Sequence, residues 1–144
     1  MALPGEEKAL QLKTLTYTSR ARLDLRDDEL NEIHQTARHL NALDGITGLL
    51  LFDGSRFLQI IEGTGGAIDN LVERLRMDPR HSAFEVRDER LVEQRSFPDW
   101  SMELLRVSAG YGNAEDAAAN MLPDTVPGPV RDLVTRMTGG RAEA

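Results

Sequence analysis

The chain has 144 residues, a formal net charge of −7, a pI near 4.9 and no cysteine. These values predict one domain with its own core, and they exclude disulfides, thiolate metal sites and cysteine nucleophiles. The acidic balance argues against nucleic acid or an anionic membrane as the main partner. No segment has the pattern of a signal peptide or a membrane span, so a cytoplasmic protein is expected. Residues 1–11 are predicted to form a polar arm, residues 12–107 the domain and residues 108–144 a helical extension.

The first third of the domain predicts a strand and then a helix. The segment Leu12–Ser19 is rich in threonine and apolar residues, as strands are, and it places Tyr17 on an apolar face. Asp24 or Asp27 is expected to cap the helix, which ends at Asp44-Gly45 because glycine commonly follows a helix terminus. Apolar residues at helical spacing predict the buried stripe of this helix: Leu30, Ile33, Ala37 and Leu40.

A β-hairpin is expected next, and the chain is organised around it. Leu49–Phe52 is wholly apolar, as in a strand covered on both faces. Asp53-Gly54 predicts a tight primed turn in which both residues have positive φ, and Phe57–Glu62 returns as the partner strand. Gln59 falls on the same apolar face as Phe57 and Ile61, because side chains alternate along a strand. An amide buried there must find hydrogen-bond partners or cost a few kcal/mol.

The second half of the domain repeats the pattern of helix and strand. A helix over Ala67–Arg76 precedes strands at Phe84–Glu93 and Trp100–Val107. Two short helices, Glu115–Met121 and Val130–Met137, are expected to cover the second face of the sheet. The order of elements predicts an α+β, ferredoxin-like βαββαβ sandwich with both long helices on one face and an added fifth strand.

Four polar residues stand where packing alone would prefer apolar ones: Tyr17, Asn41, Gln59 and Arg74. In this topology the first and third strands are neighbours, so Tyr17 and Gln59 are expected to face each other below the helices. A phenol, two amides and a guanidinium around a cleft suit a planar heterocycle with alternating carbonyl and N–H groups. The set includes no nucleophile with an adjacent base, and no enzymatic activity is expected.

Tyr17, Asn41 and Gln59 fall within three of five ordered motifs that together resemble a BLUF domain, the blue-light sensor using FAD. The motifs are Leu15–Ser19, Asn41 with Gly45–Gly48, Phe57–Gly63, Asp78–His81 and Phe97–Met102. The resemblance extends over about residues 12–107 and is to the short, single-domain type.

The resemblance implies that FAD binds noncovalently between the two long helices. Tyr17 would donate an electron and a proton to the excited flavin, and Gln59 would bridge the two and then rearrange its amide. The altered hydrogen bond to the flavin gives the small red shift typical of the family. The remaining implied roles are a polar-edge contact from Asn41, further cofactor contacts from Arg74, Asp78 and His81, and a switching pair formed by Trp100 and Met102. Output would pass through an unidentified downstream protein or altered self-association, so a homo-oligomer is expected.

Other interpretations of the same residues remain open. Taken singly, Tyr17 and Gln59 are compatible with satisfied core residues, and Asn41 with a helix end. A flavin-free ferredoxin-like module for protein association or small ligands is the main alternative, favoured by the apolar Ala37 and Leu40. A hydrolase of the acylphosphatase kind would need a glycine-rich phosphate loop after the first strand, where the sequence has Ser-Arg-Ala-Arg.

Overall fold

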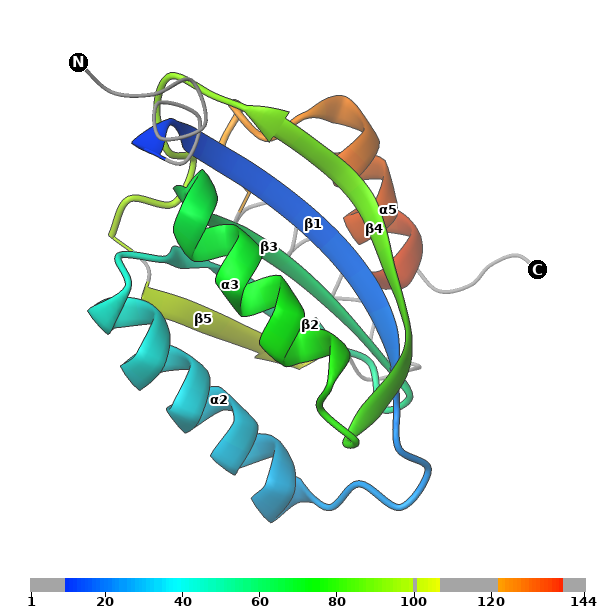
Figure 1. Ribbon diagram of the computed structural model, residues 1–144. Coiled ribbons are helices and arrows are strands. Elements are labelled where there is room, and N and C mark those ends of the chain that lie inside the picture. Colours follow the sequence, from blue (N-terminus) through cyan, green and yellow to red (C-terminus); the bar gives the residue numbers. More distant parts are fainter. Residues whose placement is uncertain (1–9, 100, 107–121, 139–144) are drawn as a thin grey trace.

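A five-stranded sheet lies between two helices on one face and a third helix on the other (Figure 1). The computed structural model describes residues 10–99, 101–106 and 122–138; the expected helix over Glu115–Met121 and residue Trp100 lie outside them. Within these residues, no helix is both long and apolar enough to span a bilayer. The elements are β1 (Leu12–Ala21), α2 (Asp27–Leu43), β2 (Thr47–Phe52), β3 (Arg56–Thr64), α3 (Gly65–Arg76), β4 (His81–Leu91), β5 (Ser101–Arg106) and α5 (Gly128–Thr138).

The strand order is β4-β1-β3-β2-β5. β1 pairs antiparallel with both β3 and β4, the hairpin joins β2 to β3, and β5 is added parallel to β2 at the sheet edge. This order confirms the predicted ferredoxin-like α+β fold with its fifth strand. It also confirms that the first and third strands are neighbours, with Tyr17 directly opposite Gln59.

Each face of the sheet carries its own apolar core. Leu49 and Leu51 contribute to the core under α5, whereas Leu50 contributes to the core under α2 and α3, so β2 is covered on both faces as predicted. In β3 the same alternation sends Leu58 toward α5 and Phe57 toward the other helices. α5 therefore covers the second face of the sheet, as expected, and the helix predicted over Val130–Met137 is confirmed.

The start of α2 differs from the prediction. Neither Asp24 nor Asp27 caps the helix: Arg26 holds the cap position, and its backbone N–H donates to Oε1 of Glu29 at 3.1 Å. The acidic side chains of the first turn instead stabilise the helix by interacting with the positive end of its dipole. The predicted end is confirmed, because Gly45 follows the helix with a φ of +72°.

The hairpin forms, but its turn is not the one expected. Only Gly54 has a positive φ, +99°, so the prediction that Asp53 shares this conformation is wrong. The Asp53 backbone N–H donates to the Arg56 carbonyl at 3.2 Å, which centres the turn on Gly54 and Ser55. The Asp53 carboxylate accepts hydrogen bonds from the backbone N–H groups of Ser55 and Arg56. These hydrogen bonds to the Asp53 side chain stabilise the turn with only one residue at positive φ.

Two further elements begin earlier than predicted. α3 starts at Gly65, because the Thr64 hydroxyl accepts from the first turn and caps the helix. β4 starts at His81 rather than Phe84, since pairing with Ala21 extends the ladder. This extension of β4 brings His81 beside the end of α3.

Candidate functional site

A cavity of about 210 Å³ lies between α2 and α3 above the middle of the sheet. α2 packs along β5, whereas α3 packs on β1 and β3, so the strands between them are left partly uncovered. This arrangement corrects the predicted stripe of α2: Leu30 is fully buried, but Leu40 is 37% exposed, and Ile33 and Ala37 are only half-buried. These three residues line the cavity together with Tyr17, Thr36, Asn41, Leu50, Phe57, Gln59, Leu71, Arg74, Leu75, Asp78, Arg80 and His81.

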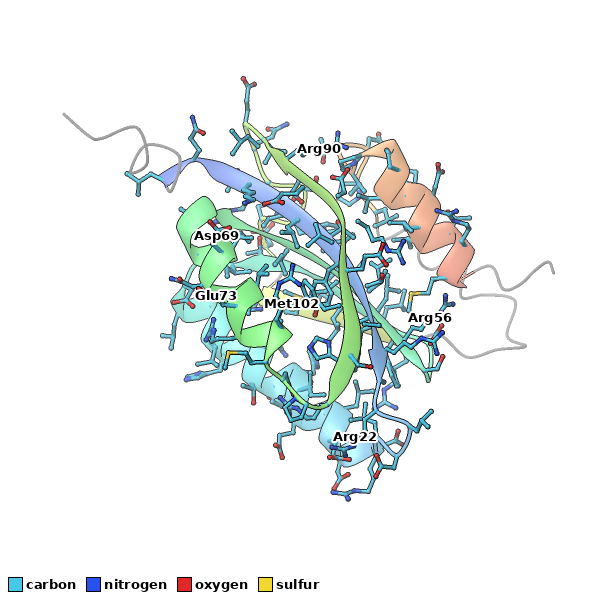
Figure 2. All side chains as sticks on the ribbon, turned by 45° about the vertical axis from the view of Figure 1, so that its right-hand side comes forward. Arg22, Arg56, Asp69, Glu73, Arg90 and Met102 are labelled. Atoms are coloured by element: carbon cyan, nitrogen blue, oxygen red, sulfur yellow. The ribbon has the colours of Figure 1, made fainter. Side chains whose placement is uncertain are left out.

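A hydrogen-bonded chain of three buried side chains starts in the cavity lining, with Tyr17 and Gln59, and continues to Met102. The Tyr17 hydroxyl donates to Oε1 of Gln59 at 2.6 Å. Nε2 of Gln59 donates to Sδ of Met102 at 3.3 Å. The three side chains come from β1, β3 and β5, so segments far apart in the sequence meet at one amide. Figure 2 places Met102 at the centre of the molecule.

The orientation of the Gln59 amide follows from its neighbours. The sulfur of Met102 can only accept, so it requires the NH₂ end of the amide, and this leaves the carbonyl for Tyr17. Burial raises the pKa of Tyr17, and the nearby charge of Asp78 raises that pKa further. The Tyr17 hydroxyl is therefore a protonated donor throughout the physiological range.

Asn41 is the one side chain of the described residues whose buried amide atoms both lack a hydrogen-bond partner within that part of the chain. It is 1% exposed and borders the cavity, and its backbone carbonyl accepts from Ile46 at 2.7 Å. Leaving a buried donor or acceptor unpaired costs about 1–3 kcal/mol. A ligand in the cavity with both a donor and an acceptor at its edge would satisfy the two atoms.

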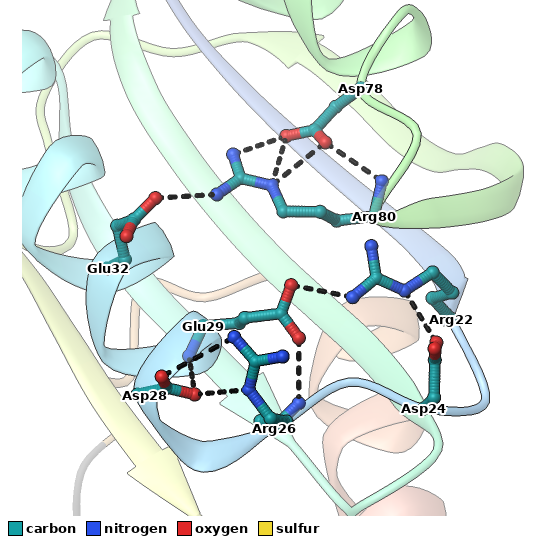
Figure 3. A network of polar contacts seen from close by, with 8 residues as sticks. All are labelled: Arg22, Asp24, Arg26, Asp28, Glu29, Glu32, Asp78 and Arg80. Carbon is teal, nitrogen blue, oxygen red and sulfur yellow. Dashed lines mark hydrogen bonds and ion pairs between the residues drawn. The ribbon is translucent and has the colours of Figure 1, made fainter.

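Charged side chains form the rim of the cavity. Arg80 clasps Asp78 through Nε and Nη2, at 3.0 and 2.7 Å, and this hydrogen-bonded guanidinium lowers the pKa of Asp78 (Figure 3). Glu32 of α2 lies 4.0 Å from the same guanidinium. Arg74 also borders the cavity, and its guanidinium pairs with the Asp44 carboxylate at 3.4 Å. The rim thus offers two arginines that are already held by carboxylates.

His81 is fixed at the edge of the same site by two hydrogen bonds. Its Nε2 must donate to the Leu75 carbonyl, so in the neutral ring Nδ1 accepts from the Ser19 hydroxyl at 2.8 Å. The ring packs edge-on against Tyr17, with centroids 6.4 Å apart. His81 therefore ties the end of α3 to β1 and also borders the cavity.

A family model for sensors of blue light using FAD matches residues 12–103. The chain belongs to the BLUF family. Photoactivated adenylate cyclase subunit beta of Euglena gracilis is 37% identical over 92 residues, which are 63% of this chain and 11% of that protein. The blue light- and temperature-regulated antirepressor BluF of Escherichia coli K12 is 36% identical over 70 residues, 49% of this chain and 17% of that protein.

Two solved structures share the fold over nearly their whole length. The dark-state structure of BlrB, a BLUF protein, is 34% identical with a TM-score of 0.72, and the match covers 90% of this chain and 96% of that one. The structure of the BlrP1 BLUF domain is 30% identical with a TM-score of 0.75, covering 91% and 93%. By contrast, the chain spans only about a tenth of the Euglena cyclase subunit.

The cavity of this BLUF domain brings together the expected cofactor residues Tyr17, Asn41, Gln59, Arg74, Asp78 and His81. Met102 joins them through Gln59, and Trp100 lies outside the described residues. Nine other lining residues were not predicted as site residues: Ile33, Thr36, Ala37, Leu40, Leu50, Phe57, Leu71, Leu75 and Arg80. Arg80 lies in the same motif as the predicted Asp78 and His81, and this position could have identified it as a site residue. The apolar lining residues carry no such signal, because their pattern is that of ordinary core.

Proposed function

We propose that this BLUF domain binds FAD noncovalently in the cavity and senses blue light through a change in the hydrogen bonds of Gln59. The observation that carries the proposal is the buried chain from Tyr17 through Gln59 to Met102, at 2.6 and 3.3 Å, together with an Asn41 amide that has no partner among the described residues. The family model, which describes sensors using FAD, supports the choice of cofactor. When bound, the flavin would absorb blue light and supply an excited-state oxidant next to the Tyr17 phenol.

The residues around the cavity fit a flavin ring. The carbonyl and N–H groups along its polar edge match the free amide of Asn41, and the apolar Ile33, Leu40 and Leu50 suit its faces. A volume of about 210 Å³ is below the roughly 300–1,000 Å³ of whole-ligand pockets, so it suits one ring system. The remaining polar part of the cofactor would lie along the rim near Asp78 and Arg80.

Gln59 can present two different hydrogen-bonding patterns to the same neighbours. In the observed orientation its carbonyl accepts from Tyr17 and its NH₂ group donates to Met102. If the amide is reversed, the NH₂ group faces Tyr17, which must then accept, and the carbonyl faces a sulfur that offers no donor. The two states differ in a few hydrogen bonds, a difference of the size that a switch requires. We assign the observed orientation to the dark state.

The output of the domain is proposed to be non-enzymatic. Curated relatives carry the matching region as a small part of a longer protein, including cyclase subunits. In this chain we expect signalling through an unidentified protein partner or altered self-association as a homo-oligomer in the cytoplasm. The proposed transmitting surface is the predicted C-terminal extension, of which the structure describes residues 122–138, with α5 covering the second face of the sheet.

A visible absorption spectrum recorded in the dark and then under blue light tests the proposal. The purified, FAD-loaded protein should show a flavin spectrum that shifts slightly to the red and reverts in darkness. Gln59→Leu and Tyr17→Phe should retain flavin but lose the shift, whereas Gln35→Leu, an exposed glutamine on α2, should behave as wild type. A normal photocycle in Gln59→Leu would contradict the proposed switch. Colourless protein after reconstitution with FAD would favour the flavin-free association module.

A further inference from the structure

Met102 occupies an irregular position in β5. In the parallel ladder Gly48 pairs with Ser101 and Leu49 pairs with Glu103, so Met102 is an extra residue opposite no partner. Its φ is +127°, a conformation that residues other than glycine rarely adopt. The side chain is nevertheless fully buried. Bulges of this kind redirect a side chain, and a strained backbone persists only where its surroundings hold it in place.

Hydrogen bonds hold both the side chain and the backbone of Met102. Gln59 donates to its sulfur at 3.3 Å, and Nε2 of His34 lies 2.8 Å from its backbone oxygen. A carbonyl only accepts, so His34 is the donor. His34 projects from α2, the helix that packs along β5. The same helix contacts the end of β5 a second time, because Arg106 bonds to Asp27 and Asn31.

We propose that His34 is a positioning residue that holds the Met102 bulge and thereby keeps a sulfur acceptor in front of the Gln59 amide. The inference rests on the proposed function, because its consequence is a bias on the switch. With Met102 in place, only the dark orientation of Gln59 gives the NH₂ group an acceptor on that side. Without the His34 hydrogen bond, the bulge at Met102 and its positive φ are less strongly stabilised. Met102 would then withdraw from Gln59, and the preference for the dark orientation would weaken.

The test compares His34→Leu with His34→Gln in the full chain. The Gln side chain also ends in an Nε2–H donor of similar reach, so it should restore what Leu removes. His34→Asn keeps an amide but stops short, and it replaces His34→Leu in the comparison if the latter does not fold. His39→Gln, at an exposed position on the same helix, is the matched control.

Two readouts separate positioning from general stability. The first is the dark-state NMR signal of the Met102 methyl group, assigned with Met102→Leu, together with hydrogen exchange of the β5 amides. The second is the lifetime of the red-shifted state in the FAD-loaded protein. We expect His34→Leu and His34→Asn to move the methyl signal, speed exchange in β5 and lengthen that lifetime by up to about fivefold, the factor for one hydrogen bond of ordinary net strength. His34→Gln and His39→Gln should stay near wild type.

The two proposals fail in distinguishable ways. If the wild type shows no light-induced shift, the proposed function is wrong, but the methyl signal still reports whether His34 positions Met102. A folded His34→Leu or His34→Asn variant with the wild-type methyl signal and β5 exchange would overturn the inference. So would a His34→Gln variant that resembles His34→Leu, because a lost ring contact would then explain both.

Discussion

Gly48 is a position where one added methyl group should cost much of the stability of the domain. A Cβ built on Gly48 would lie 1.9 Å from the backbone oxygen of Ile60 and 2.9 Å from its carbonyl carbon. Both atoms belong to the paired strand β3, so neither can rotate away. The φ of Gly48 is +152°, which adds backbone strain for any other residue. Overpacking costs about 1–3 kcal/mol and an unfavourable backbone conformation about as much, so Gly48→Ala should lose about 2–6 kcal/mol. The upper part of this range is expected, because the 1.9 Å contact is with a backbone atom.

Urea unfolding followed by far-ultraviolet circular dichroism measures this loss as a lower transition midpoint at an unchanged slope. Gly45→Ala is the matched control, because Gly45 also has a positive φ, +72°, but a Cβ there would meet no atom of the described residues within 4 Å. That variant should lose only the stability that glycine provides in a left-handed conformation, about 1–2 kcal/mol. If the free energies of unfolding of Gly48→Ala and Gly45→Ala differ by less than about 1 kcal/mol, the close approach of β2 to β3 is not as described and the reasoning is refuted.

Three further predictions concern buried or paired polar groups. Asn41→Leu should stabilise the flavin-free protein by about 1–3 kcal/mol, because it removes two buried amide atoms that have no partner among the described residues. It should also weaken FAD binding at least tenfold in a titration, and unchanged affinity would contradict the site. Glu62, 2% exposed, accepts backbone N–H groups of Ser96 and Phe97 at 2.8 Å each. Glu62→Leu should therefore lose about 2–4 kcal/mol and Glu62→Gln clearly less, and equal losses in urea unfolding would refute this assignment. The pKa of Asp78 lies below its ordinary value of 3.8, so the ionised carboxylate stabilises the folded protein above about pH 4, and this stabilisation is lost as the pH falls further. In acid unfolding, the stability of the wild type should therefore fall more steeply below about pH 4 than that of Asp78→Asn. Parallel curves would argue against the pair with Arg80.

Much of the candidate site follows from local pattern and strand order. Alternation along two strands puts Tyr17 and Gln59 on apolar faces, and the ferredoxin-like order makes those strands neighbours. The prediction that the two side chains meet required no other knowledge, and a hydrogen bond of 2.6 Å confirms it. The prediction for α2 was less successful. Its apolar spacing identified the inward face correctly, but three of the four residues on that face line a cavity instead of packing in the core.

By itself, therefore, the sequence determined the order of elements, the inward faces and the family motifs, because these depend on periodicity and on residue types at short spacing. Only the tertiary structure decided that α2 packs on β5 and α3 on β1 and β3. This packing opens the cavity and leaves the Asn41 amide without a partner in the described part of the chain. It also decided that β5 carries an extra residue, so that Met102 reaches Gln59 with a φ of +127°. A local pattern states which side of an element is buried. What stands opposite that side depends on the packing of segments that are 40 or more residues away, as in the pairs of Gln59 with Tyr17 and with Met102.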